Sequence, residues 1–190
     1  LERFLAQIPS HILVIIDQAY LEYVDDPDYP NGIDYISDGR VLTLRTFSKI
    51  YGLAGLRIGY GVGASALISY LNRVREPFNV NRIAQVAAQA ALRDQEHFRL
   101  SKEMNHQGKK KLYHGFDELG LDYLPSEANF ILFSTSFAAK DVFQAMLRKG
   151  VIIRTADIFG LPKHIRVTVG TDEQNQRFLR SLRETLMELR

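Results

Sequence analysis

The most constraining feature of the sequence is the run His11–Asp17 (HILVIID), in which an unbroken aliphatic stretch ends in an acid. Its continuous aliphatic and β-branched character predicts a strand buried on both faces, as in the parallel sheet of an α/β protein. Asp17 would then stand at the carboxyl end of that strand, where open α/β sheets form their ligand crevices. Further strands are predicted over 41–46 and 56–62.

The remainder of the chain reads as alternating helices and short strands. Helices are predicted over 64–75, over about 82–119 with an interruption around Gly108, and over 138–149; strands are predicted over 129–133, 151–154 and 164–169. Thr171 followed by Gln174 has the form of a capping box and predicts the start of the last helix. The spacing of its apolar residues predicts one apolar helix face, made of Phe178, Leu179, Leu182, Leu186 and Leu189. The composition changes between residues 63 and 80. We therefore expect two parts, 1–72 as half of a larger α/β domain and 73–190 as a self-contained α+β domain.

Composition excludes several classes of function. Lys plus Arg number 24 and Asp plus Glu 22, so the net charge of +2 gives no general attraction to nucleic acid or anionic membranes. The absence of cysteine excludes disulfides, thiol nucleophiles and iron–sulfur clusters, and it is compatible with a reducing compartment. Five histidines show no metal-ligand spacing, so no metal is expected, and Lys109–Lys111 are predicted to form a solvated helix face.

The sequence shows no pattern of a membrane span or of a targeting segment. The longest aliphatic stretch, residues 12–16, is far too short to span a bilayer, and we expect no membrane association. The first residues lack the pattern of a signal peptide and also lack a methionine. The chain therefore begins as if a preceding segment had been removed.

Lys49 is the strongest candidate for chemistry. It follows a predicted strand within Thr46–Arg57 (TFSKIYGLAGLR), where Thr46 and Ser48 offer hydroxyls, glycines allow close backbone approach, and Arg57 offers a planar fork for phosphate. An amine beside a phosphate cradle fits a Schiff-base cofactor better than a nucleotide-binding loop. On spacing alone, a solvated lysine and a structural arginine remain open, as does a turn-capping role for Asp17.

The motifs taken together resemble one known family. Residues 17–20 (DQAY), Ser48-Lys49 with Arg57, and residues 55–60 (GLRIGY) are similar to the fold-type I aminotransferases that use pyridoxal 5′-phosphate. Within that family, residues 43–49 (TLRTFSK) and 166–171 (RVTVGT) most resemble the histidinol-phosphate aminotransferases. The resemblance runs through the whole chain and implies a partial large α/β domain followed by the C-terminal α+β small domain.

The resemblance also implies roles for individual residues. Lys49 would bond the cofactor and act as general acid and base, and Asp17 would keep the pyridinium nitrogen protonated. Tyr20 would donate a hydrogen bond to the phenolic oxygen of the cofactor. Ser48, Thr46 and Arg57 would hold its phosphate.

Two further arginines are implied in substrate binding. Arg166 would grip the substrate α-carboxylate, and Arg154 matches a second substrate-binding arginine of the family. Without the family, each reads as a strand-end arginine paired with a nearby acid. Both lie in the second part of the chain, so substrate binding there could draw that part onto the cofactor domain and exclude water.

Family members are nearly twice this length, so the chain resembles their C-terminal part. The missing half would supply an aromatic that stacks on the cofactor ring, a further phosphate loop and several strands. We therefore expect the 190-residue piece to be inactive alone. The resemblance also implies a cytoplasmic homodimer that acts on small amino acids and phosphorylated amines.

The leading functional hypothesis is transamination between histidinol phosphate or imidazole acetol phosphate and glutamate or 2-oxoglutarate, in histidine biosynthesis. A threonine-phosphate decarboxylase is the enzymatic alternative, since it shares the lysine and the aspartate but releases CO₂. A non-enzymatic alternative is the aminotransferase-like sensor domain of a transcription regulator, which would require a DNA-binding segment ahead of residue 1.

Overall fold

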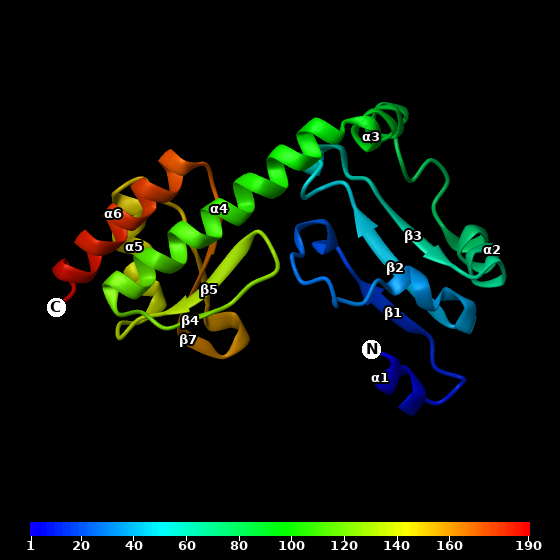
Figure 1. The fold of residues 1–190 in the computed structure, drawn as a ribbon, viewed down its shortest axis with the longest axis horizontal. Coiled ribbons are helices and arrows are strands. Elements are labelled where there is room, and N and C mark those ends of the chain that lie inside the picture. The colour runs from blue at the N-terminus through cyan, green and yellow to red at the C-terminus, as the bar shows by residue number, and fades with distance from the viewer. The chain divides into compact units, whose positions relative to one another are not determined.

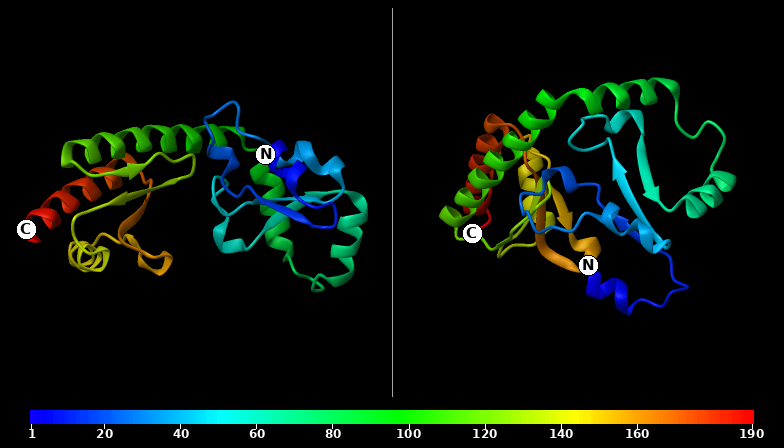
Figure 2. Two further views of the ribbon diagram at one scale, coloured as in Figure 1. Left: turned by 90° about the horizontal axis from the view of Figure 1, so that it is seen from below. Right: turned by 45° about the vertical axis from the view of Figure 1, so that its right-hand side comes forward.

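The computed structural model describes all residues from 1 to 190, and they form two compact units, Leu1–Leu100 and Ser101–Arg190. Figures 1 and 2 show the ribbon of both units. Each unit has a sheet of its own, three-stranded in the first and four-stranded in the second. No helix combines the length and apolar character needed to cross a membrane.

The sheet of the first unit has the strand order β1-β2-β3. β1 (Val14–Asp17) runs parallel to β2 (Val41–Thr46), and β3 (Gly59–Gly63) runs antiparallel to β2 (Figure 1). β1 and β2 therefore end at the same edge of the sheet. This confirms the predicted parallel pair and places the ends of both strands where a ligand crevice was expected.

β1 is not buried on both faces, contrary to the expectation from its sequence. Val14 is buried against Leu5 and Val41, whereas Ile15 on the opposite face has 56% of its surface exposed. β1 is an edge strand, and the elements of this unit cover only one of its faces. An aliphatic run alone does not distinguish a covered face from one that this chain leaves open.

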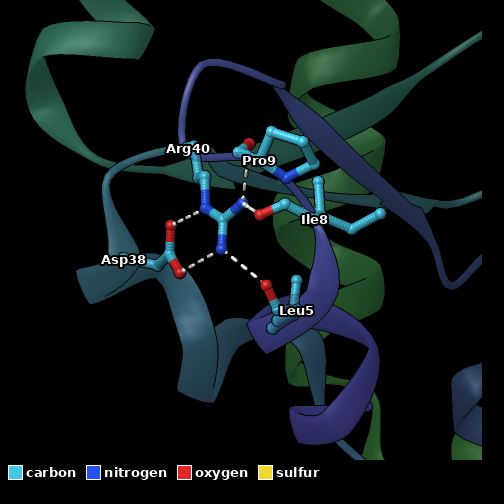
Figure 3. Close-up of polar contacts among 5 residues, drawn as sticks. All are labelled: Leu5, Ile8, Pro9, Asp38 and Arg40. Atoms are coloured by element: carbon cyan, nitrogen blue, oxygen red, sulfur yellow. Dashed lines mark hydrogen bonds and ion pairs between the residues drawn. The ribbon is translucent and has the colours of Figure 1, made fainter.

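A short helix, α1 (Glu2–Gln7), is fastened to the sheet by Arg40, which directly precedes β2 (Figure 3). The guanidinium donates to the carbonyl oxygens of Leu5 and Ile8, each at 2.7 Å, and its Nε lies 2.5 Å from the Asp38 carboxylate. These bonds give the Ile8 carbonyl a donor and add a second donor to the Leu5 carbonyl, which also accepts from the Ile8 N–H. Arg40 thus fixes α1 against the strand pair.

Helices α2 (Ser65–Val74), α3 (Arg82–Arg93) and α4 (Gln95–Leu119) follow the first sheet. The predicted long helix breaks at Asp94 rather than at Gly108. The Asp94 carboxylate accepts a hydrogen bond from the backbone N–H of His97 and so caps the start of α4. α4 is continuous through Gly108, where the glycine lets the helix pass close to Val169: a Cβ there would lie 2.4 Å from Val169 Cγ1.

The second unit packs helices on one face of an antiparallel sheet with the order β4-β5-β7-β6 (Figure 2). Its elements are the second part of α4, β4 (Tyr123–Leu124), β5 (Phe130–Ser134), α5 (Ala139–Arg148), β6 (Arg154–Ala156), β7 (Leu161–Thr168) and α6 (Asp172–Glu188). The core takes alternate residues of β5 and β7 together with residues of all three helices. The capping box at Thr171 and Gln174 is confirmed, and so is the apolar face of α6.

The compact units meet at Leu100 and Ser101, further along the chain than the expected division at 72 and 73. Contacts within the first unit explain the difference. His97 Nε2 lies 2.9 Å from the carbonyl oxygen of Ile50, and the Phe98 ring packs on Tyr51 with centroids 6.1 Å apart. The start of α4 is therefore packed against the loop that follows β2.

Candidate active site

A pocket of about 400 Å³ lies at the edge of the first sheet where the two parallel strands end. Its lining consists of Asp17, Ala19, Leu44, Arg45, Thr46, Ser48, Lys49, Ala54 and Arg57. Five residues singled out from the sequence are among them, from the ends of β1 and β2 and from the loop after β2. The structure thus brings together a carboxylate, two hydroxyls, an amine and a guanidinium.

Asp17 is the last residue of β1, and its Oδ1 accepts a hydrogen bond from the backbone N–H of Ala19 at 3.0 Å. The turn is held further by the buried Gln18, whose Oε1 accepts from the Gly32 N–H and whose Nε2 donates to the Pro30 carbonyl. Asp17 therefore both caps its turn and lines the pocket. Its Oδ2 makes no hydrogen bond within the chain and remains available to a ligand.

Lys49 lies three residues beyond the end of β2, and its ammonium is 4.8 Å from the centroid of the Tyr20 ring. A cation over an aromatic face is attracted by the ring quadrupole, so Tyr20 holds the lysine side chain in place. The turn before Lys49 is closed by Thr46 Oγ1, which accepts from the Ser48 N–H at 3.1 Å. Tyr20 itself contacts Lys49 rather than lining the pocket.

Arg57 has a backbone conformation that non-glycine residues rarely adopt, with φ 56° and ψ 58°. This left-handed conformation is unfavourable for a residue with a Cβ, and backbone strain of this kind clusters at functional sites. Its Nη1 donates to the Ala54 carbonyl at 2.7 Å, while its other N–H groups make no hydrogen bond within the chain. Those free groups line the pocket and can bind an anion.

Arg45, which also lines the pocket, forms a buried ion pair that the sequence did not suggest. Arg45 and Glu22 approach to 3.6 Å with both side chains almost fully buried, and Arg45 Nη2 also donates to Asn31 Oδ1 at 2.8 Å. Burial raises the pKa of the Glu22 carboxyl above its ordinary value, although Arg45 opposes the shift. A charged residue within β2, whose other five residues carry no charge, was the signal that could have revealed this pair.

Two tyrosines complete the cluster around that ion pair. Burial is also the main cause that raises the pKa of Tyr51 and of Tyr60, and the nearby Glu22 raises both further. The Phe47 ring packs between them, with centroids 5.1 Å from Tyr51 and 5.7 Å from Tyr60. The neutral phenols therefore persist well into the alkaline range.

Arg154 and Arg166 belong to the second unit, where they are direct cross-strand neighbours on β6 and β7. Arg166 lies over the Phe130 ring, with its guanidinium carbon 4.9 Å from the ring centroid. Neither arginine forms an ion pair with an acid within the chain, so the structural role that the sequence left open for them is not observed. Two unneutralised guanidinium groups on one sheet face form an anion-binding arrangement.

Comparison with known proteins identifies the family. The family model described as "Aminotransferase class I and II" matches residues 1–182, so the chain belongs to that family. It is 55% identical over 188 residues to the histidinol-phosphate aminotransferase of Moorella thermoacetica. The aligned region covers 98% of this chain and 49% of that protein. The chain spans about half the length of the curated relatives it matches.

Solved structures agree on the fold. Histidinol-phosphate aminotransferase from Sinorhizobium meliloti, in complex with pyridoxal-5′-phosphate, superposes with a TM-score of 0.92 at 28% identity, covering 99% of this chain and 52% of that one. L-threonine-O-3-phosphate decarboxylase from Porphyromonas gingivalis gives 0.80 at 27% identity, covering 92% and 55%. The chain thus has the α/β fold of fold-type I aminotransferases and corresponds to part of it.

Proposed function

We propose that this chain carries the lysine-bearing part of a pyridoxal-phosphate-dependent aminotransferase that exchanges amino groups between histidinol phosphate or imidazole acetol phosphate and glutamate or 2-oxoglutarate. The observation that carries the proposal is the pocket in which Lys49 lies with Asp17 and Arg57. The family match and the 55% identity to a histidinol-phosphate aminotransferase support the substrate class.

The residues of the pocket fit pyridoxal phosphate chemically. The cofactor carries a phosphate, a basic ring nitrogen and an aldehyde; the pocket offers hydroxyl and guanidinium donors, a carboxylate with a free oxygen, and an amine. Thr46, Ser48 and Arg57 would hold the phosphate, Asp17 the ring nitrogen, and Lys49 the aldehyde carbon. Tyr20, packed against Lys49, would donate to the phenolic oxygen. When bound, the cofactor supplies an electron sink for the electrons of the substrate Cα–H bond.

The chain's own residues then divide the work of the reaction. The carboxylate of Asp17 keeps a proton on the ring nitrogen, because an opposite charge stabilises the protonated form. Lys49 Nζ would take the proton from the substrate Cα as general base and deliver it, as general acid, to the carbon that is the aldehyde carbon of the free cofactor. Arg166 binds the substrate carboxylate as a bidentate fork, and Arg154 binds the second anionic group.

The proposal extends to the organisation of the protein. Residues 1–72 would belong to the cofactor domain and residues 73–190 to the small domain. The whole protein would be a cytoplasmic homodimer. Exposed apolar side chains in the first unit, including Ile15, Val74 and Phe78, support a covering partner surface.

Reduction with borohydride in the presence of pyridoxal phosphate, followed by peptide mapping, tests the cofactor site. We expect one dominant label on Lys49 that disappears in Lys49→Ala and persists in Lys110→Ala, a variant of an exposed lysine. A label spread over exposed lysines in the intact protein would contradict the assignment. In the 190-residue chain alone, the same spread would mean that the pocket needs further chain to form.

Decarboxylation is the second candidate, favoured by the superposition on the threonine-phosphate decarboxylase. The two activities share the lysine and the carboxylate, so the pocket does not separate them. Product analysis does, since only the transaminase consumes a keto acid and only the decarboxylase releases CO₂. We expect keto-acid consumption without CO₂ from phosphorylated amine substrates.

A further inference from the structure

Helix α4 presents three polar side chains at four-residue spacing, Asn105, Lys109 and Tyr113, which lie along one side of the helix. Asn105 and Lys109 have only 3% and 5% of their surface exposed. The sequence predicted that Lys109 lies on a solvated helix face, and this prediction is wrong because the side chain is buried. We call these three residues the α4 stripe.

The α4 stripe holds the backbone of the segment between β4 and β5. Lys109 Nζ donates to the Ser126 carbonyl at 3.0 Å, and Asn105 Nδ2 donates to the Ala128 carbonyl at 3.3 Å. Tyr113 accepts a hydrogen bond at its hydroxyl oxygen from the Ser126 N–H at 2.8 Å. This segment has no strand partner at those groups, and buried backbone groups without partners are unfavourable.

The segment held by the α4 stripe leads directly to Phe130, the residue that supports Arg166. The Asn129 carbonyl accepts from the Val169 N–H at 2.8 Å, at the end of β7. Phe130 begins β5, and its ring lies under the Arg166 guanidinium at 4.9 Å. Only Asn129 therefore stands between Ala128, whose carbonyl Asn105 holds, and Phe130, whose ring carries Arg166.

The use of a lysine at this buried position points to a positional role. Taking an ammonium out of water is unfavourable, whereas a methionine of similar length would fill the same space without that penalty. The ammonium adds a strong, directed hydrogen bond to the Ser126 carbonyl oxygen, which a methionine could not make. This bond fixes the backbone ahead of Phe130.

We propose that the α4 stripe is a positioning device for Arg166, with Lys109 as its central residue. By fixing the 126–128 backbone, it fixes Phe130 and, through that ring, the guanidinium that binds the substrate's anionic group. Side-chain placement within about 1 Å can decide orders of magnitude in rate and binding. The inference rests on the proposed function, which assigns Arg166 to substrate binding.

The test compares Lys109→Met with Lys110→Met in the intact protein. Both remove one positive charge from adjacent positions of α4, but Lys110 is exposed. Binding of succinate, an unreactive dicarboxylate, is measured by calorimetry, alongside KM and kcat for glutamate. We expect Lys109→Met to raise the succinate Kd and the glutamate KM roughly tenfold and to leave kcat within about twofold. Lys110→Met should change none of them.

Two further variants separate positioning from general loss of stability. Leu112→Ala opens a cavity in the core next to the α4 stripe and should destabilise the unit while leaving succinate affinity intact. Tyr113→Phe removes only the hydroxyl that accepts from Ser126, and should raise the succinate Kd about threefold even if Lys109→Met fails to fold. Equal losses of affinity in Leu112→Ala and Lys109→Met would overturn the positioning role.

Arg166→Lys distinguishes failure of this inference from failure of the proposed function. It removes the planar fork but keeps the charge, and it should weaken succinate binding at least as much as Lys109→Met. If Arg166→Lys binds succinate normally, the proposed role of Arg166 is wrong. If Arg166→Lys loses affinity while Lys109→Met and Tyr113→Phe keep it, the α4 stripe does not position Arg166.

Discussion

Arg154 and Arg166 face each other as direct partners on the antiparallel strands β6 and β7, and no acid of the chain neutralises either one. Like charges in directly opposed positions of a sheet repel each other. An anion bound between the two guanidinium groups would relieve this repulsion. This arrangement is typical of a site built for function rather than stability.

Replacing one of the two arginines should therefore stabilise the second unit. We expect Arg154→Thr to raise the free energy of unfolding by roughly 0.2–1 kcal/mol at low salt and to weaken succinate binding. Lys163→Thr removes the same charge from an exposed position of β7 and is the control. Urea unfolding of the three proteins measures the effect; an equal gain in Lys163→Thr would point to net charge instead of the opposed pair.

The left-handed conformation of Arg57 predicts a difference between two variants that both lose the guanidinium. Glycine adopts φ 56° without steric strain, whereas an alanine at this position would remain strained because of its Cβ. Arg57→Gly should be about 1 kcal/mol more stable than Arg57→Ala by denaturant unfolding, with pyridoxal-phosphate affinity lowered in both. An alanine variant as stable as the glycine variant would show that this backbone is unstrained or has relaxed.

Gly108 should not tolerate a methyl group despite its helical position. A Cβ there would lie 2.4 Å from Val169 Cγ1 and 2.9 Å from Asn175 Nδ2, distances that require the packing to shift. Gly108→Ala should lose about 1–3 kcal/mol of unfolding free energy, which outweighs the helix propensity gained. Gln107→Ala, at the exposed neighbouring position, should stay within about 0.5 kcal/mol of the parent. Thermal unfolding of both variants checks this.

The buried Glu22 predicts an unusual pH dependence of stability. Its pKa is raised in the folded protein, mainly by burial, so the folded state keeps a proton that the unfolded state loses near pH 4.5. This group's contribution to the free energy of unfolding therefore falls as the pH rises above 4.5, until the folded pKa is passed.

Urea unfolding between about pH 4 and pH 7 measures that contribution as the difference between the parent protein and Glu22→Gln. The difference should change with pH in the stated direction. Glu173→Gln, which alters an exposed carboxylate of α6, should run parallel to the parent. A parallel curve for Glu22→Gln as well would mean that the Glu22 carboxyl titrates alike in both states.

Prediction from the sequence was most successful where local patterns decide structure. The capping box at Thr171, the strand Val41–Thr46 and the apolar face of α6 depend on neighbours in the chain, and all are confirmed. Residues 46–57 were predicted to form an anion site around Lys49, and the family resemblance added Asp17; Asp17, Thr46, Ser48, Lys49 and Arg57 all line one pocket. Their roles toward a cofactor stay predictions.

Apart from the helix break at Asp94, which has a local cap, the errors concern contacts between segments distant in the sequence. The burial of Lys109 depends on the backbone of residue 126, the exposure of Ile15 on which face of β1 is covered, and the place of Gly108 inside α4 on the approach of Val169. The pairing of Arg45 with Glu22 is of the same kind. None of these contacts leaves a periodic signal in the sequence.

The sequence by itself determined the α/β character, the helix caps and the chemical groups near Lys49, because these follow from periodicity, turn chemistry and the order of residues along a strand. Tertiary structure alone decided which charges are buried, which arginines oppose each other and which backbone is held in place. The physical reason is that burial and pairing depend on surfaces that only the folded chain brings together. Lys109 shows the difference: the sequence predicts a solvated cation, whereas in the fold it is a buried hydrogen-bond donor.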